Sequence, residues 1–188
     1  MSFTAQYVET ARETDDASLI ARARVGDEAA IDSLVRRYLG DVYSVTSRVL
    51  HDTELAQDAA QDALINAVRG LHRFRGEASF RTWLMRIALN AARTLARKQV
   101  RRREVPLDHV EETPVDAPDT ASMVAMHDEA ERATRVLAQL PEKQRMAVTL
   151  RIRQGLSYQE IGAVLECTEG AARVNYHLGV KRLRELMK

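Results

Sequence analysis

The stretch from Phe74 to Arg103 constrains the fold most, because its apolar and basic residues recur with the period of an α-helix. At about 100° per residue, an apolar stripe collects on one side and basic residues on the other. Ser79 is a suitable N-cap, and the interior is rich in the helix formers Ala, Leu, Arg and Met. The stretch predicts a helix over 79–99 with an apolar face of Phe80, Leu84, Ile87, Ala88, Ala91 and Leu95, a polar face of Arg86, Asn90, Arg93 and Arg97, and Trp83 at the border.

The polar face of this helix has a composition suited to single-stranded nucleic acid. Residues 73–76 precede the helix with the sequence Arg-Phe-Arg-Gly, which supplies two cations, an aromatic ring and a flexible glycine. Cations contact phosphates and aromatic rings stack on unpaired bases, each stack being worth roughly 1–3 kcal/mol. A solvated basic face with Trp83 in the core explains the same pattern, and this stretch alone does not separate the two interpretations.

Charge is segregated along the chain although the net charge is only +1. Glu77 is the only acid between Arg69 and Arg103, whereas the segment from Glu104 to Glu131 is acidic and contains no Lys or Arg. This segregation indicates an anionic partner for the basic part, beside an acidic tether that stays off nucleic acid or lies where nucleic acid would lie.

A first helical unit is expected over residues 16–103, after a tail at 1–15 with little to bury. A helix begins at Asp16, Asp27 caps a second one, and Thr53 is a natural cap for a third over 54–71. Together with the helix at 79–99, these elements predict a compact helical bundle. The third helix exposes a polar, acidic side formed by Gln57, Asp58, Gln61 and Asp62.

Residues 104–128 are expected to form a flexible acidic linker, because they hold three of the four prolines and few large apolar residues. A second unit follows over 129–188. In it, Ser157 and Glu160 form a capping box, a short turn follows, and Thr168 caps the last helix. Helix, short turn, helix, with Gly162 allowing a close crossing, is the helix-turn-helix layout. The last helix is expected to pack Ala172, Tyr176, Gly179 and Leu183 inward and to present Arg173, Val174, His177 and Lys181 to a major groove. An ordinary helical hairpin is the alternative.

Other classes of protein find little support in the sequence. The single cysteine, Cys167, excludes an internal disulfide framework and fits a reducing compartment. No HExxH, CxxC or Gly-rich phosphate loop occurs, and the histidines are scattered. No apolar run approaches the length of a membrane span. We therefore expect a cytoplasmic protein that is not an enzyme, with no catalytic residue, cofactor, metal site or membrane insertion.

Several motifs, taken in order, resemble those of the extracytoplasmic-function (ECF) sigma factors of bacterial RNA polymerase. The motifs are Gln-Asp-Ala-Ala-Gln-Asp-Ala-Leu at 57–64, Phe-Arg-Gly at 74–76, Trp-Leu-Met-Arg-Ile-Ala-Leu-Asn at 83–90, Leu140-Pro141 with Arg145, and Gly-Leu-Ser-Tyr-Gln-Glu-Ile-Gly at 155–162. Each motif is weak singly, but the ordered set is specific and extends over nearly the whole chain after residue 15. The resemblance implies an all-α fold of two small helical domains, a promoter-melting bundle and a C-terminal helix-turn-helix domain, joined by the acidic linker.

The resemblance also implies roles for particular residues. Asn90 would read one flipped base of the minus-ten element through its amide, and Trp83 would pack near the point of strand separation. Around them, Phe74, Gly76, Ala78, Ser79 and Ile87 would line the base pocket, and Arg86, Arg93 and Arg97 would hold phosphates. Arg173, Val174, His177 and Lys181 would read the minus-thirty-five element as duplex. Gln57, Asp58, Gln61 and Asp62 would contact the coiled coil of the polymerase β′ subunit.

The expected partners are core RNA polymerase, through its β′ coiled coil and β flap, promoter DNA, and an anti-sigma factor that responds to stress or another signal. Two departures from the family pattern stand out. Val68 replaces a frequent tryptophan, and Val174, His177 and Leu178 are unusual in the recognition helix. An alternative is a stand-alone helix-turn-helix regulator, but it leaves the helix from Trp83 to Asn90 and the acidic side at Asp58 unexplained.

Overall fold

The computed structural model describes residues 15–50, 52–104 and 135–187, and all regular structure within them is helical. The elements are a helix over 15–24, α2 (Glu28–Val49), α3 (Thr53–Gly70), the 3₁₀ helix η1 (Leu71–Arg73), α4 (Phe80–Glu104), a helical turn at 135–138, α6 (Glu142–Ile152), α7 (Tyr158–Leu165) and α8 (Glu169–Leu186). The all-α prediction is therefore confirmed. The tail at 1–14 and the segment 105–134, which contains nearly all of the predicted linker and the start of the second unit, lie outside the described residues.

Most helix starts lie where short-range signals predict them. The Asp27 carboxylate accepts from the amide of Ala30 at 3.1 Å, and Ser157 and Glu160 form the predicted capping box. The start of α3 differs, because Asp52 is its cap and accepts from the Leu55 amide at 3.0 Å. Thr53, predicted as that cap, is instead the first helical residue. Asp is the stronger N-cap of the two neighbours, which accounts for the one-residue shift.

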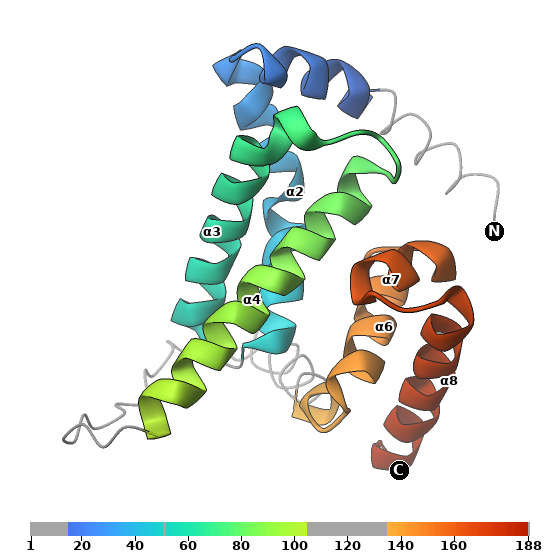
Figure 1. Cartoon of the computed structure of the whole chain (residues 1–188). Helices are drawn as coiled ribbons and strands as arrows, with labels where there is room; N and C mark the ends of the chain where they lie inside the picture. Colours follow the sequence, from blue (N-terminus) through green and yellow to red (C-terminus); the bar gives the residue numbers. More distant parts are fainter. Residues whose placement is uncertain (1–14, 51, 105–134, 188) are drawn as a thin grey trace, which may run out of the picture.

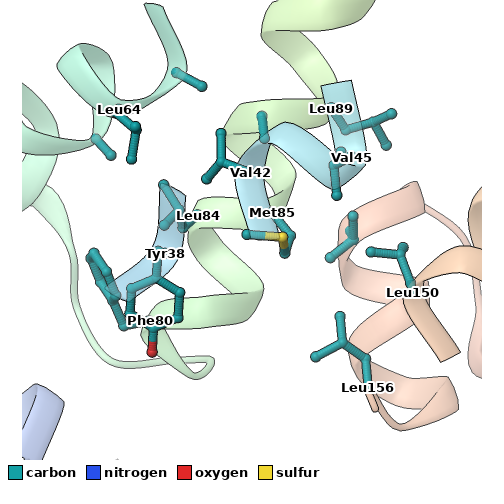
Figure 2. Close-up of a cluster of buried hydrophobic side chains, with 14 of the residues drawn as sticks. Tyr38, Val42, Val45, Leu64, Phe80, Leu84, Met85, Leu89, Leu150 and Leu156 are labelled. Atoms are coloured by element: carbon teal, nitrogen blue, oxygen red, sulfur yellow. The ribbon is translucent and has the colours of Figure 1, made fainter. Parts of the chain in front are cut away.

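The helices pack into two units that share one hydrophobic core. Helices α2 and α4 lie in the middle, with α3 on one side and the unit of α6, α7 and α8 on the other (Figure 1). A single cluster of buried side chains runs through both units. Figure 2 shows Val45 and Met85 of the first unit facing Leu150 and Leu156 of the second. The two units are thus held together by apolar burial as well as by the chain that joins them.

The predicted faces of α4 are present, but the buried face is broader than expected. Phe80, Leu84 and Ala88 are buried as predicted. Met85 and Leu89, which were not assigned to the apolar face, are 0% exposed. The reason is that α4 is covered twice, by α2 and α3 on one side and by the second unit on the other.

The crossing of α7 with the start of α8 depends on Gly162. A Cβ atom there would lie 2.7 Å from the backbone oxygen of Cys167, so no larger residue fits without a shift. Glu166 takes a left-handed conformation with φ 55° at the end of α7, which makes the turn short. Thr168 then caps α8, accepting from the Ala171 amide at 3.2 Å. The predicted helix-turn-helix layout is confirmed.

Candidate nucleic-acid interface

A hollow of about 200 Å³ lies beside the N-terminal end of α4. The loop after η1 forms one wall and the first turns of α4 form the other. Ala163 of α7 closes one edge. The lining residues are Arg73, Phe74, Arg75, Gly76, Glu77, Ala78, Thr82, Trp83, Arg86 and Ala163. Five of the residues predicted for the minus-ten element therefore line one cavity: Phe74, Gly76, Ala78, Trp83 and Arg86.

Local backbone geometry creates this hollow. Helix α3 ends at Gly70, where a Cβ would lie 3.4 Å from the Trp83 ring, so the helix end approaches that ring closely. The chain then reverses through η1 and through Gly76, which has φ +76°, a value that favours glycine. Ser79 ends the loop by capping α4, since its hydroxyl oxygen accepts from the Thr82 amide at 3.2 Å. The loop is thus fixed at its junction with α4.

An aromatic cluster forms the floor of the hollow. The Phe74 ring lies 5.3 Å from Trp83 and 5.6 Å from Phe80, measured between centroids. Phe80 in turn packs edge-on against Tyr38 at 5.4 Å. Phe74 and Trp83 are half-buried, so part of each remains accessible from the hollow. Such half-exposed rings offer a stacking surface to an unpaired base.

Beyond the hollow, the outer face of α4 carries the remaining predicted residues. Asn90, Arg86 and Arg97 are exposed, and Ile87 is half-buried. The Asn90 backbone oxygen accepts from Thr94 at 2.8 Å. The exposure of Asn90 keeps the base-reading hypothesis open. Ser79, Ile87, Asn90, Arg93 and Arg97 do not line the hollow itself, so the predicted set divides between a cavity and an adjoining helix face.

The second unit contacts this face through two carboxylates. Glu142 accepts from Arg93 Nε at 2.7 Å, and Glu160 accepts from the Thr82 hydroxyl at 2.9 Å. Arg81 also donates to Gln154 at 2.8 Å. The sequence did not predict these contacts, because each joins residues that are far apart in the chain. For Glu160, the capping box with Ser157 already accounted for the carboxylate.

The Glu160 carboxyl group serves two helices at once. Burial opposes its ionisation, but hydrogen bonds from Ser157, Thr82 and Ser79 outweigh burial and hold the pKa of this carboxyl below its usual value. The ionised group therefore lies between the start of α7 and the start of α4. It accepts from the hydroxyl of Thr82, which lines the hollow, so that donor is already engaged.

The recognition helix α8 presents the predicted residues to solvent. Arg173, Val174, His177 and Lys181 are exposed, whereas Ala172 and Gly179 are buried against the rest of the unit. Arg173 pairs with Glu169 at 2.9 Å and lies over the Tyr158 ring at 5.3 Å. Leu178, 48% exposed, adds apolar surface to the same helix.

Helices α3 and α2 together present a second candidate interface. Gln57, Asp58, Gln61 and Asp62 are all exposed, as predicted. Gln57 and Gln61 border an apolar groove of about 800 Å³, together with Val35, Leu39, Gly40, Tyr43, Ala60, Leu64, Ile65, Val68 and Arg69. Leu39 is 50% exposed and Ile65 is 39% exposed. Sequence reasoning missed this groove, although two large apolar residues on otherwise polar helix surfaces were a signal for it.

The described part of the chain offers neither a metal site nor a membrane-spanning helix. No group of three or more His, Cys, Asp or Glu side chains there could hold a metal ion. None of the helices described is both long enough and apolar enough to cross a membrane.

Comparison with known proteins defines the class to which these two units belong. The family model for sigma-70 region 2 matches residues 34–102, and the model for sigma-70 region 4 matches residues 130–183. The chain is 36% identical over 172 residues to the RNA polymerase sigma-H factor of Pseudomonas aeruginosa, covering 86% of this chain and 88% of that protein. It is 35% identical over 166 residues to the ECF RNA polymerase sigma-E factor of Escherichia coli, covering 84% and 86% respectively.

Solved structures give the same result. The structure of CnrH in complex with the cytosolic domain of CnrY has a TM-score of 0.68 at 25% identity, covering 92% of this chain and 96% of that one. The sigma factor RpoE in complex with the anti-sigma factor NepR from Bartonella quintana shares the fold, with a TM-score of 0.66 at 21% identity over 83% of this chain and 95% of that one. The chain belongs to the sigma-70 family of RNA polymerase sigma factors, in its ECF group. Its function is to direct core polymerase to specific promoters and so to initiate transcription.

Proposed function

We propose that the hollow at the start of α4 and the outer face of α4 together hold the unpaired minus-ten strand. The observation that carries this proposal is the juxtaposition of a small cavity, floored by Phe74 and Trp83, with the exposed amide of Asn90. Asn90 reads a base that has left the duplex, through the donors and the acceptor of its amide. Phe74, Gly76, Ala78, Ser79 and Ile87 shape the space around that base, and Trp83 lies where the strands separate.

The arginines of α4 hold the phosphates of the same strand. Arg86 and Arg97 are exposed on the same face of α4 as Asn90, one turn before it and two turns after it. Arg93 lies between them and is paired with Glu142. We propose that DNA phosphates replace Glu142 as the partner of Arg93 when the promoter opens. The second unit must then move away from α4, because Ala163 lines the hollow and Glu160 accepts from Thr82, another of its lining residues.

The recognition helix α8 reads the minus-thirty-five element as duplex DNA. Arg173 and Lys181 supply cations, His177 supplies a ring with polar nitrogens, and Val174 offers an apolar contact of the kind that suits thymine methyl groups. The exposure of all four side chains supports this assignment.

Polymerase binds the exposed side of α3. Gln57, Asp58, Gln61 and Asp62 supply a polar, acidic surface for the β′ coiled coil, and the apolar groove beside Gln57 and Gln61 accepts side chains from one of its helices. The second unit engages the β flap.

Reversing one charge, as in Asp58→Arg, is expected to weaken retention of the chain on core polymerase while leaving its folding unchanged. Equal retention of the variant would contradict this assignment.

The remaining assignments follow from the family. The chain performs no chemistry of its own and acts in the cytoplasm, where core polymerase lies. An anti-sigma factor controls it, as the complex of RpoE with NepR illustrates for a protein of the same fold. We keep domain bounds of 16–103 and 129–188, with the linker at 104–128, as part of the proposal. The family models match residues 34–102 and 130–183, which lie inside these two units and support the division.

Run-off transcription with core polymerase on a random promoter library tests the proposal. The chain is expected to produce defined start sites that share upstream sequences at two positions, one for each unit. Core polymerase alone is the control. A chain that binds DNA without polymerase and never produces a defined start is instead the stand-alone helix-turn-helix regulator.

A further inference from the structure

Arg24, the last residue of the helix over 15–24, contacts the segment that opens the hollow. Its Nε donates to the backbone oxygen of Leu71 at 3.1 Å, and its Nη2 donates to the backbone oxygen of Phe74. Leu71 begins η1 and Phe74 follows its last residue. One guanidinium therefore joins both ends of η1 to the helix at 15–24, which lies across the end of α3 in Figure 1.

The helix that carries Arg24 is firmly attached to the bundle. Leu19, Ile20 and Ala23 are buried in the shared core. Asp16 is only 5% exposed, and its carboxylate accepts hydrogen bonds from Arg37 at 2.6 Å and from the Tyr38 hydroxyl. Because this helix is fixed to the bundle, the hydrogen bonds of Arg24 can hold the segment from Leu71 to Phe74 in position.

The loop that Arg24 contacts needs such support. Between Phe74 and Ser79 its residues are exposed, and the ion pair between Arg75 and Glu77, 4.0 Å apart, is exposed as well. An exposed pair of this kind adds little stability. Ser79 fixes the far end of the loop by capping α4, and Arg24 fixes the near end at the Phe74 backbone.

We propose that Arg24 is a positioning residue for base capture. By holding the backbone oxygens of Leu71 and Phe74, it sets the direction in which the loop leaves η1, and with it the position of the Phe74 ring over Trp83. The inference rests on the proposed function of the hollow as a base pocket. The region 2 family model begins at residue 34, so Arg24 lies before the residues it matches.

A purely structural role makes a different prediction. A cation near the carbonyl end of α3 and η1 stabilises those helices through their dipole. Such a role changes the stability of the chain without changing which base is preferred. The two roles are therefore distinguished by loop position and base discrimination, not by stability alone.

Arg24→Gln removes the charge and the paired donors, and Arg22→Gln is its matched control. Arg22 lies on the same helix, is exposed, and pairs with Asp27 at 2.8 Å instead of contacting the loop. Trp83 is the single tryptophan and borders the hollow, so acrylamide quenching of its fluorescence reports the loop position. Quenching is expected to rise in Arg24→Gln, to stay at the wild-type level in Arg22→Gln, and to be partly restored in Arg24→Lys.

The second measurement uses the complete holoenzyme on promoters that differ at one minus-ten base. Arg24→Gln is expected to reduce the ratio of opening rates between the best and worst base by about threefold to tenfold, because only part of the free energy of its two lost hydrogen bonds affects the base. Equal losses on every promoter, or the same loss in Arg22→Gln, would overturn the inference. If wild-type holoenzyme opens no promoter, the proposed function fails. The quenching comparison would still decide whether Arg24 fixes the loop, and unchanged quenching in Arg24→Gln would overturn that part too.

Discussion

Two faces of this sigma factor are proposed to contact promoter DNA, and they differ in how they are built. The face on α8 belongs to a single helix, and Arg173, Val174, His177 and Lys181 all point to solvent. The face on α4 is composite, because it combines a loop, a helix end and an exposed stripe, and the second unit contacts it through Glu142 and Glu160. One face is open in this structure and the other is partly covered.

This difference indicates an order of events. Duplex DNA can reach α8 without any rearrangement of the described residues, whereas a flipped base needs α7 to leave the rim of the hollow. Polymerase, which binds both units in the proposal, can separate them by holding each at its own site. The five predictions that follow test how independent the two faces are.

Gly162→Ala is expected to have the largest effect, on α8 alone. The added Cβ would lie 2.7 Å from the Cys167 backbone oxygen, and overpacking of this kind costs about 1–3 kcal/mol. Urea unfolding should show the loss, and minus-thirty-five binding should fall with it. Gly170→Ala is the control, since nothing lies within 4 Å of its Cβ position and stability should be unchanged or higher.

Asn90→Ala is expected to act only on the α4 face. Loss of a base-reading amide costs about 1–3 kcal/mol of discrimination, which corresponds to roughly fivefold to 150-fold between promoters. Polymerase binding should be unchanged, and Thr94→Ala, which removes a neighbouring exposed hydroxyl on the same face, should discriminate as the wild type does. Equal loss of polymerase binding and discrimination would mean that Asn90 is structural.

Glu160→Gln is expected to loosen the contact between the α4 face and the second unit. The free chain should bind a single-stranded minus-ten oligonucleotide several-fold more tightly than wild type, because the negative charge beside Thr82 is removed. Glu166→Gln, an exposed change in the following turn, should leave this affinity unchanged. Fluorescence anisotropy measures both, and unchanged affinity in Glu160→Gln would argue against the covered state.

The same residue predicts a dependence on pH. The folded-state pKa of Glu160 lies below its ordinary value of 4.5, so its stabilising effect is fully present above that value and is lost as the pH falls through the lowered pKa. The difference in unfolding free energy between wild type and Glu160→Gln should therefore be constant near neutral pH and shrink in acid. A difference that grows as the pH falls would have the wrong sign.

Arg93→Ala and Arg97→Ala are expected to have the smallest effects. Each should lower holoenzyme affinity similarly on all promoters and reduce the salt dependence of binding by about one phosphate contact. In the free chain the two should differ, because Arg93 is engaged by Glu142 while Arg97 is exposed. Glu142→Gln should then raise the affinity of the free chain for single-stranded DNA when Arg93 is retained. In an Arg93→Ala background the same change should have no effect. An unchanged salt slope would remove the arginine concerned from the phosphate contacts.

Features set by neighbouring residues were predictable from the sequence. The capping box of Ser157 and Glu160, the cap at Thr168 and the inward position of Ala172 and Gly179 are all present in the structure. Even the shift from Thr53 to Asp52 at the start of α3 is a choice between neighbours. Caps and amphipathic faces depend on residues within about four positions, which a single sequence displays directly.

Features that join distant parts of the chain were not predictable in this way. Met85 and Leu89 are apolar in the sequence, but their complete burial depends on the helices that pack on both sides of α4. The partners of Arg93 and Thr82, the apolar groove beside Gln61, and the contact of Arg24 with Phe74 arise likewise from helices far apart in sequence. Amino-acid order alone was enough for the helices, their polar faces and the family to which the chain belongs. The covering of one DNA face by the other unit was decided by tertiary packing, because it depends on how apolar surfaces on separate helices fit together in space.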